Sequence, residues 1–104
     1  MSNEEQLIFN YLKTYAQGKV NKKTSNEIQQ VTGLPTGGRT NEHIREIIRK
    51  LIIFNEALIG SDSGGYWIIQ NKCELEAVVN GLNSRAKEVK ERAIALQNNW
   101  ERRN

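Results

Sequence analysis

The sequence predicts a mainly α-helical protein of the α+β class, with one small β-hairpin and a long C-terminal helix. Three patterns carry this prediction: apolar stripes at helical spacing in the first half, two β-prone runs around a Gly/Ser/Asp loop, and a heptad repeat over the last third. The chain has 104 residues, 38% of them hydrophobic, and no internal repeats. The length is therefore sufficient for one modest globular core, and the hydrophobic content argues against disorder.

The first two predicted helices have clear local signals. The apolar stripe Leu7, Ile8, Tyr11, Leu12, Tyr15, ended by Gly18, predicts a helix over about 4–17. A second, short helix is expected over 25–32. There Thr24 and Glu27 form a capping box, Gly33 follows as a left-handed C-cap, and Pro35 prevents continuation.

A third helix and a hairpin follow. The spacing of Ile44, Ile47, Ile48 and Leu51 predicts a helix over about 40–54, with Thr40 or Asn41 near its N-cap. Residues 57–59 and 66–69 are β-prone and flank a Gly/Ser/Asp loop, which is typical of a β-hairpin. Helix, short capped helix, longer helix and hairpin in this order predict a winged helix-turn-helix domain over residues 1–70.

The last third, residues 71–104, predicts one long amphipathic helix. Its apolar residues follow a 4–3 spacing, and we call this set the seam: Leu75, Val79, Leu82, Ala86, Val89, Ala93, Leu96 and Trp100. Gly81 interrupts the pattern and allows a bend. We expect the seam to pair with a second copy of the chain as a dimer interface. The alternative is that it packs back on the first helix, against Leu7, Tyr11 and Tyr15.

Composition excludes several classes of protein. No apolar run reaches the ~20 residues of a membrane span, and the acidic start is unlike a signal peptide. The single Cys73 and single His43 exclude an intrachain disulfide and a Cys/His zinc site. We find no phosphate-binding glycine loop, nucleophile pair or acidic metal cluster, so we expect no enzyme, metal, cofactor or small-molecule ligand.

The net charge of +3 is unevenly distributed. Residues 13–50 carry +5, whereas the first 12 residues carry −2 and residues 51–104 are neutral. An excess of this kind over a helix-turn-helix is an electrostatic footprint for nucleic acid.

We therefore expect the third helix to enter the DNA major groove, with backbone contacts from the second helix and the hairpin. The candidate DNA-binding residues are Lys22, Lys23, Thr24, Ser25, Arg39, Thr40, Asn41, His43, Arg45, Arg49, Ser61 and Ser63. Glu42, Glu46 and Asp62 lie among them and would repel phosphate. The prediction is therefore that one copy binds DNA weakly and that two copies bind together.

One resemblance bears on origin. Ile44 to Ile48, Leu58-Ile59, Ser61 to Tyr66 and Ser84-Arg85-Ala86 follow in an order that resembles a family of small phage and prophage proteins. The resemblance covers about 65 residues and implies a winged helix-turn-helix fold and DNA binding. The chain departs from the family at Asn55-Glu56-Ala57, where a Gly-x-Pro is usual, so Asn55 is expected to take the left-handed position.

Together these patterns predict a sequence-specific, double-stranded DNA-binding homodimer that acts as a transcriptional regulator or replication accessory. We expect it in the cytoplasm of a bacterial host, at the nucleoid. The alternative is a protein–protein interaction module on a winged-helix scaffold that binds a replication or transcription protein without touching DNA. The arginines at 39, 45 and 49 distinguish the two, because only the DNA binder needs them.

Overall fold

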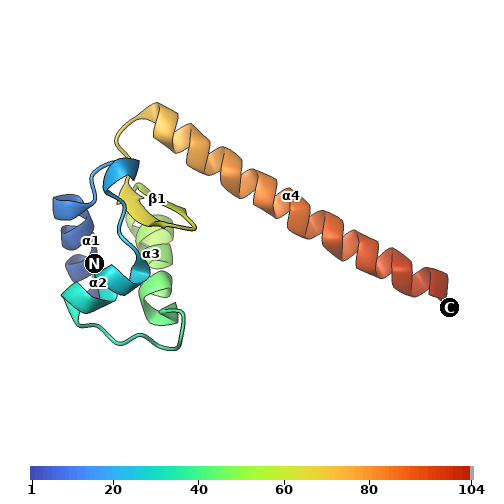
Figure 1. Ribbon diagram of the computed structural model, residues 1–104, viewed down its shortest axis with the longest axis horizontal. Coiled ribbons are helices and arrows are strands. Elements are labelled where there is room, and N and C mark those ends of the chain that lie inside the picture. The colour runs from blue at the N-terminus through green and yellow to red at the C-terminus, as the bar shows by residue number, and fades with distance from the viewer. Residues whose placement is uncertain (104) are drawn as a thin grey trace.

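The computed structural model describes residues 1–103, in which helices dominate and two strands form one hairpin (Figure 1). The elements are α1 (Asn3–Tyr15), a 3-10 turn η1 (Lys19–Asn21), α2 (Ser25–Thr32), α3 (Glu42–Asn55), β1 (Ile59–Asp62), β2 (Gly65–Ile68) and α4 (Lys72–Arg103). The predicted fold class, mainly α with a small β-hairpin and a long C-terminal helix, is confirmed.

The core lies where α1, α2 and α3 meet under the hairpin. Leu12 from α1, Ile28 from α2 and Ile44 and Leu51 from α3 are fully buried, and Ile59 of β1 packs with them. The apolar spacing of α3 therefore turns one face inward and leaves its polar face in solvent.

The helix ends explain the helix-turn-helix geometry. The capping box of α2 is present, since the Glu27 amide donates to Thr24 Oγ1 at 3.1 Å and the Thr24 amide donates to Glu27 Oε1 at 3.3 Å. Gly33 ends α2 in the left-handed conformation (φ 70°). The prediction for Asn55 is wrong. Asn55 is the last residue of α3, and Glu56 takes the left-handed conformation instead (φ 58°).

The hairpin is held by a third stretch of chain. β1 and β2 pair antiparallel, with Ile59 opposite Ile68 and Asp62 opposite Gly65. Lys23, just before α2, also exchanges two backbone hydrogen bonds of 2.8 Å with Tyr66 of β2. This bridge fixes the position of the hairpin relative to the start of α2.

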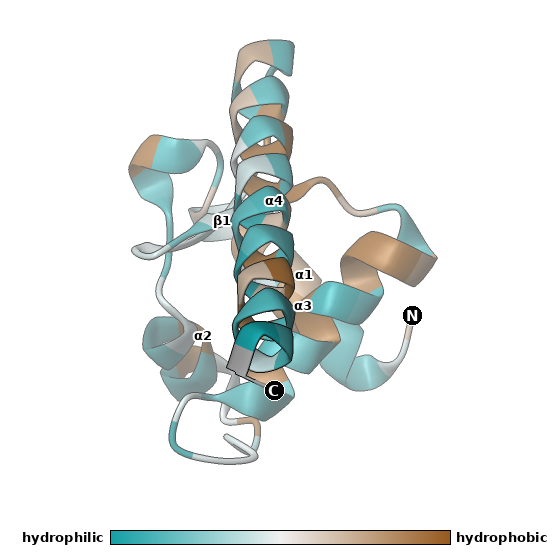
Figure 2. Cartoon of the chain, turned by 90° about the vertical axis from the view of Figure 1, so that its right-hand side faces the viewer, coloured by the Kyte–Doolittle hydropathy of each residue, from teal (hydrophilic) through white to brown (hydrophobic). Residues whose placement is uncertain are grey.

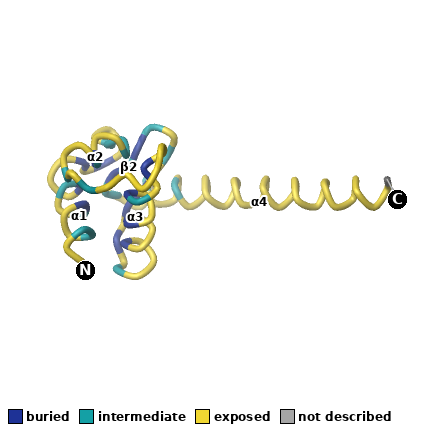
Figure 3. The backbone as a smooth tube through the Cα atoms, turned by 90° about the horizontal axis from the view of Figure 1, so that it is seen from below, coloured by how far each residue is buried: buried dark blue, intermediate teal, exposed yellow. Residues whose placement is uncertain are grey.

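α4 leads away from the other elements (Figure 1), and the molecule as a whole measures 55 × 33 × 24 Å. It is one continuous helix without a bend at Gly81. Nearly its whole length is exposed (Figure 3), and apolar residues recur among hydrophilic ones along it (Figure 2). Because α4 points away from α1, the seam does not pack back on Leu7, Tyr11 and Tyr15 in this structure.

Candidate nucleic-acid interface

The solvent-facing side of α3 carries alternating charges. Arg49 donates two hydrogen bonds to Glu46, at 2.9 Å from Nε and 2.8 Å from Nη2. These bonds from Arg49 lower the pKa of Glu46 and raise that of Arg49. The two-point contact uses the same donors that would read a base edge, so Glu46 would compete with a DNA base for Arg49.

Arg45 and Arg39 are more available than Arg49 for contact with an external acceptor. Thr40 donates a 2.6 Å hydrogen bond to Glu42, which lowers the pKa of that carboxyl group. Arg45 makes only a long 3.5 Å contact, to Thr40 Oγ1, and neither arginine forms an ion pair within residues 1–103. Both guanidinium groups are exposed and free to contact an external acceptor.

Asn41 is buried, and His43 is half-buried and paired with another helix. Asn41 is only 4% exposed, and its amide donates to Asn26 Oδ1 at 2.6 Å and Ser25 Oγ at 3.2 Å. The His43 ring nitrogen Nε2 lies 2.6 Å from a carboxylate oxygen of Glu4 in α1. Asn41 thus ties the start of α3 to the start of α2, and His43 ties α3 to α1. In this structure their polar groups are used internally.

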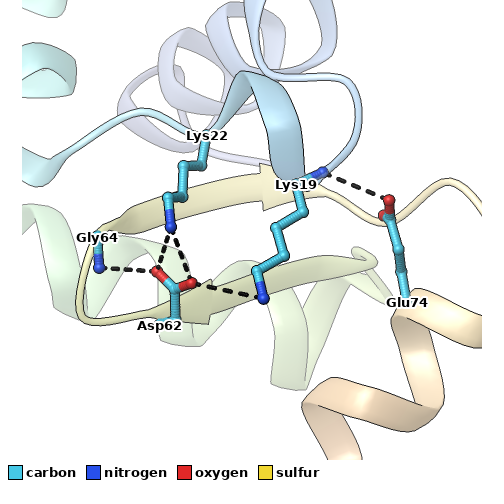
Figure 4. Close-up of polar contacts among 5 residues, drawn as sticks. All are labelled: Lys19, Lys22, Asp62, Gly64 and Glu74. Atoms are coloured by element: carbon cyan, nitrogen blue, oxygen red, sulfur yellow. Dashed lines mark hydrogen bonds and ion pairs between the residues drawn. The ribbon is translucent and has the colours of Figure 1, made fainter.

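The hairpin tip is neutralised by two lysines, one of which, Lys22, was predicted to contact DNA (Figure 4). Lys22 Nζ lies 3.0 Å from Asp62 Oδ2, Lys19 Nζ lies 3.9 Å from the same oxygen, and the Gly64 amide donates to Asp62 Oδ1 at 2.7 Å. The hydrogen bond from Lys22 lowers the pKa of Asp62. The local repulsion expected from Asp62 is therefore offset, while the charge of Lys22 is partly consumed.

Six of the predicted DNA-binding residues line one cleft of about 650 Å³, which we call the polar cleft. They come from the start of α2, the turn before α3, α3 itself and the hairpin: Thr24, Ser25, Thr40, Arg45, Ser61 and Ser63. Asn26, Asp62 and Tyr66 line the same cleft, and sequence reasoning missed its second arginine, Arg85 of α4. In the sequence, the one sign that Arg85 could belong to the site is its position directly before the seam residue Ala86.

A second depression, the apolar groove, lies between α3 and the first turns of α4 and has a volume of about 630 Å³. Its exposed apolar residues are Ile52, Leu58, Leu75, Val79 and Leu82. Three of these belong to the seam, which continues outward as exposed side chains: Val89 is 58% and Leu96 64% exposed. The predicted dimer-interface residues thus face solvent in the single chain.

Other classes of site are not found in the described residues. No group of three His, Cys, Asp or Glu side chains within residues 1–103 is placed to hold a metal ion. Across the same residues, no helix has the length and apolar character to span a membrane. Comparison with known protein families, curated proteins and solved structures finds no match for this chain.

Proposed function

We propose that this protein binds double-stranded DNA, with α3 in the major groove and the polar cleft against the neighbouring sugar–phosphate backbone. One observation carries the proposal: residues from four separate segments, chosen from the sequence as DNA contacts, line a single polar cleft beside α3. Hydroxyl groups and exposed guanidinium groups are the donors that most often contact phosphate.

The donors have distinct roles in this proposal. Arg45, and Arg39 at the turn before α3, are free to donate two hydrogen bonds to a guanine, a contact worth about 1–3 kcal/mol of discrimination. Ser61 and Ser63 of the hairpin donate to phosphate oxygens. The start of α2 adds the partial positive charge of a helix N-terminus.

The balance of charge on α3 favours two copies on one DNA. Glu42 and Glu46 oppose phosphate, so one copy binds weakly, and pairing of the α4 seams brings a second α3 to the same duplex. In this proposal the dimer acts by occupying phage or prophage DNA inside a bacterial cell, as a regulator or a replication accessory.

Fluorescence anisotropy with a labelled duplex pool tests DNA binding. Affinity should fall by about three orders of magnitude between 50 and 200 mM salt if six or more phosphates are contacted. Arg45→Gln should weaken binding by about tenfold to a hundredfold. Lys87→Gln, which removes the same charge from the outer side of α4, is the matched control and should change little. Absence of binding at 50 mM salt, or equal loss in both variants, contradicts the proposal.

Sedimentation tests the dimer. Leu82→Asp and Val89→Asp place a charge in the seam and should give monomers, because an unpaired charge in an apolar interface is strongly unfavourable. Ser84→Asp adds the same charge on the opposite side of α4 and should leave the dimer intact. A monomeric wild-type chain would refute dimerisation.

The apolar groove supports one second candidate, a protein-interaction module whose target helix lies against α3 and α4. That function needs Ile52 and Leu58, and Arg45 and Arg49 line the same groove. A chain that fails to bind DNA at 50 mM salt but binds a helical peptide in a way that Ile52→Asp abolishes would favour this candidate.

A further inference from the structure

The seam and the apolar groove form one continuous apolar surface. Leu75, Val79 and Leu82 begin the seam and also form one wall of the groove. Ile52 and Leu58 form the apolar end of the other wall, which α3 continues with Arg45 and Arg49. Residues 86–102 of the helix are all exposed. A helix with this much exposed apolar surface gains stability mainly from packing, so an occupant that covers the seam also covers the apolar end of the groove, beside Ile52 and Leu58.

We infer that the occupant is the α4 helix of a second copy, running antiparallel, with Leu75 of each chain opposite Trp100 of the other. In this register every small seam residue faces a larger one. Ala86 faces Val89 of the second copy, and Ala93 faces Leu82 of the second copy. No layer then consists of two alanines, so none has the cavity that a pair of small side chains would leave.

A parallel pair fits less well. It would place Ala86 against Ala86 and Ala93 against Ala93, which leaves two underfilled layers, and it would crowd two Trp100 side chains into one layer. The helix dipoles favour the antiparallel arrangement too, because the N-terminal end of each helix then lies beside the C-terminal end of the other.

The antiparallel pair also completes the polar cleft, and this step rests on the proposed DNA binding. Arg85 and Arg92 lie one heptad apart on the side of the seam that faces the hairpin, and Arg85 lines the cleft. Antiparallel pairing brings Arg92 of the second copy next to Arg85 of the first. Two adjacent guanidinium groups repel each other until an anion lies between them, so a DNA phosphate at the cleft strengthens the dimer.

The same register sets the distance between the two domains. Leu75 and its counterpart in the second copy lie about 38 Å apart along the helix axis. The bases of the two arms are therefore separated by a length close to the ~34–36 Å of one turn of B-DNA, which is the spacing of two helix-turn-helix units on one face of a duplex.

The native Cys73, which is exposed, allows a direct test. A nitroxide on Cys73 of the wild-type dimer, measured by pulsed electron–electron double resonance, should give a distance of about 44 Å in the antiparallel pair. A parallel pair would give roughly 20 Å, since paired helix axes lie about 8–10 Å apart. A dominant short distance, or a chain that stays monomeric at the labelling concentration, overturns the inference.

Arg92 separates this inference from the proposed function. In the dimer, Arg92→Gln should weaken DNA binding about as much as Arg85→Gln, whereas in the Leu82→Asp monomer it should have a much smaller effect than Arg85→Gln. Equal effects of Arg92→Gln in monomer and dimer contradict the composite cleft. A nitroxide distance of about 44 Å in a dimer that does not bind DNA would refute DNA binding but not the antiparallel pair. A distance of roughly 20 Å in a dimer that binds DNA would refute the antiparallel pair but not DNA binding.

Discussion

Replacing Asp62 with asparagine tests the electrostatics of the hairpin tip. Asparagine keeps an oxygen for the Gly64 amide but removes the negative charge that holds Lys22 at 3.0 Å and Lys19 at 3.9 Å. Both ammonium groups then become available to DNA phosphates at the edge of the polar cleft. We expect Asp62→Asn to bind DNA more tightly than the wild type.

The magnitude follows from counterion release. Each additional phosphate neutralised steepens the slope of log affinity against log salt by about 0.9, which corresponds to about an eightfold gain per copy at 0.1 M salt. The cost in fold stability is small, because the side chains of Lys22 and Asp62 are 36% and 30% exposed and a pair of this kind contributes about 0.2–1 kcal/mol.

Anisotropy titrations at four or five salt concentrations measure the DNA affinity and its dependence on salt. Asp62→Glu, which preserves the charge, is the control and should leave the slope unchanged. If Asp62→Asn folds normally and both its affinity and its slope equal those of the wild type, the lysines at the hairpin do not reach phosphate and the reasoning is refuted.

Three further predictions concern stability. Asn41→Ala should lower the free energy of unfolding by about 2 kcal/mol, because two buried hydrogen bonds are lost and alanine must adopt a left-handed conformation. Asn41→Gly should recover about 1 kcal/mol of this loss, because glycine adopts that conformation without strain. Equal denaturation midpoints for the two variants would exclude backbone strain as a cause. Gly60→Ala should destabilise the fold by about 1–3 kcal/mol, since the added Cβ would lie 2.6 Å from the Trp67 ring. Gly81→Ala should instead stabilise α4 by about 0.5–1 kcal/mol, because a Cβ there meets open space. Chemical denaturation of the two variants measures both changes. Because the pKa of Asp62 is lowered, its contribution to stability is present above about pH 4 and is lost as the pH falls through the folded value, so acid titration followed by circular dichroism should show a shallower loss in Asp62→Asn.

The elements of this fold were predictable because their signals are local. The capping box at Thr24 and Glu27, the left-handed Gly33 and the spacing of the α3 isoleucines each fall within a few residues, and all three appear in the structure as expected. The bounds of α2, 25–32, agree at both ends. Asn55 was misassigned because residue preference favours asparagine for a left-handed turn, whereas the helix continues one residue further and requires that conformation of Glu56.

The candidate site was only partly predictable, because its geometry depends on contacts between distant segments. From the sequence, Asp62 is expected to repel phosphate, yet Lys22, 40 positions earlier in the chain, neutralises its charge. Asn41 reads as a base-reading residue, yet its amide is buried against α2. Arg85 joins the polar cleft only because of the angle at which α4 leaves the hairpin, and that angle has no local signature.

The direction of α4 depends on one carboxylate at its base. Glu74 accepts hydrogen bonds from the backbone amides of Gln70 at 3.1 Å and Lys19 at 3.4 Å, which anchors the first turn of α4 to η1 (Figure 4). A helix of 32 residues acts as a lever about this anchor, since one degree of rotation moves its far end by about 0.8 Å. In the proposed dimer, the spacing of the two domains along a duplex would therefore be sensitive to Glu74, some 45 Å from the end of the arm.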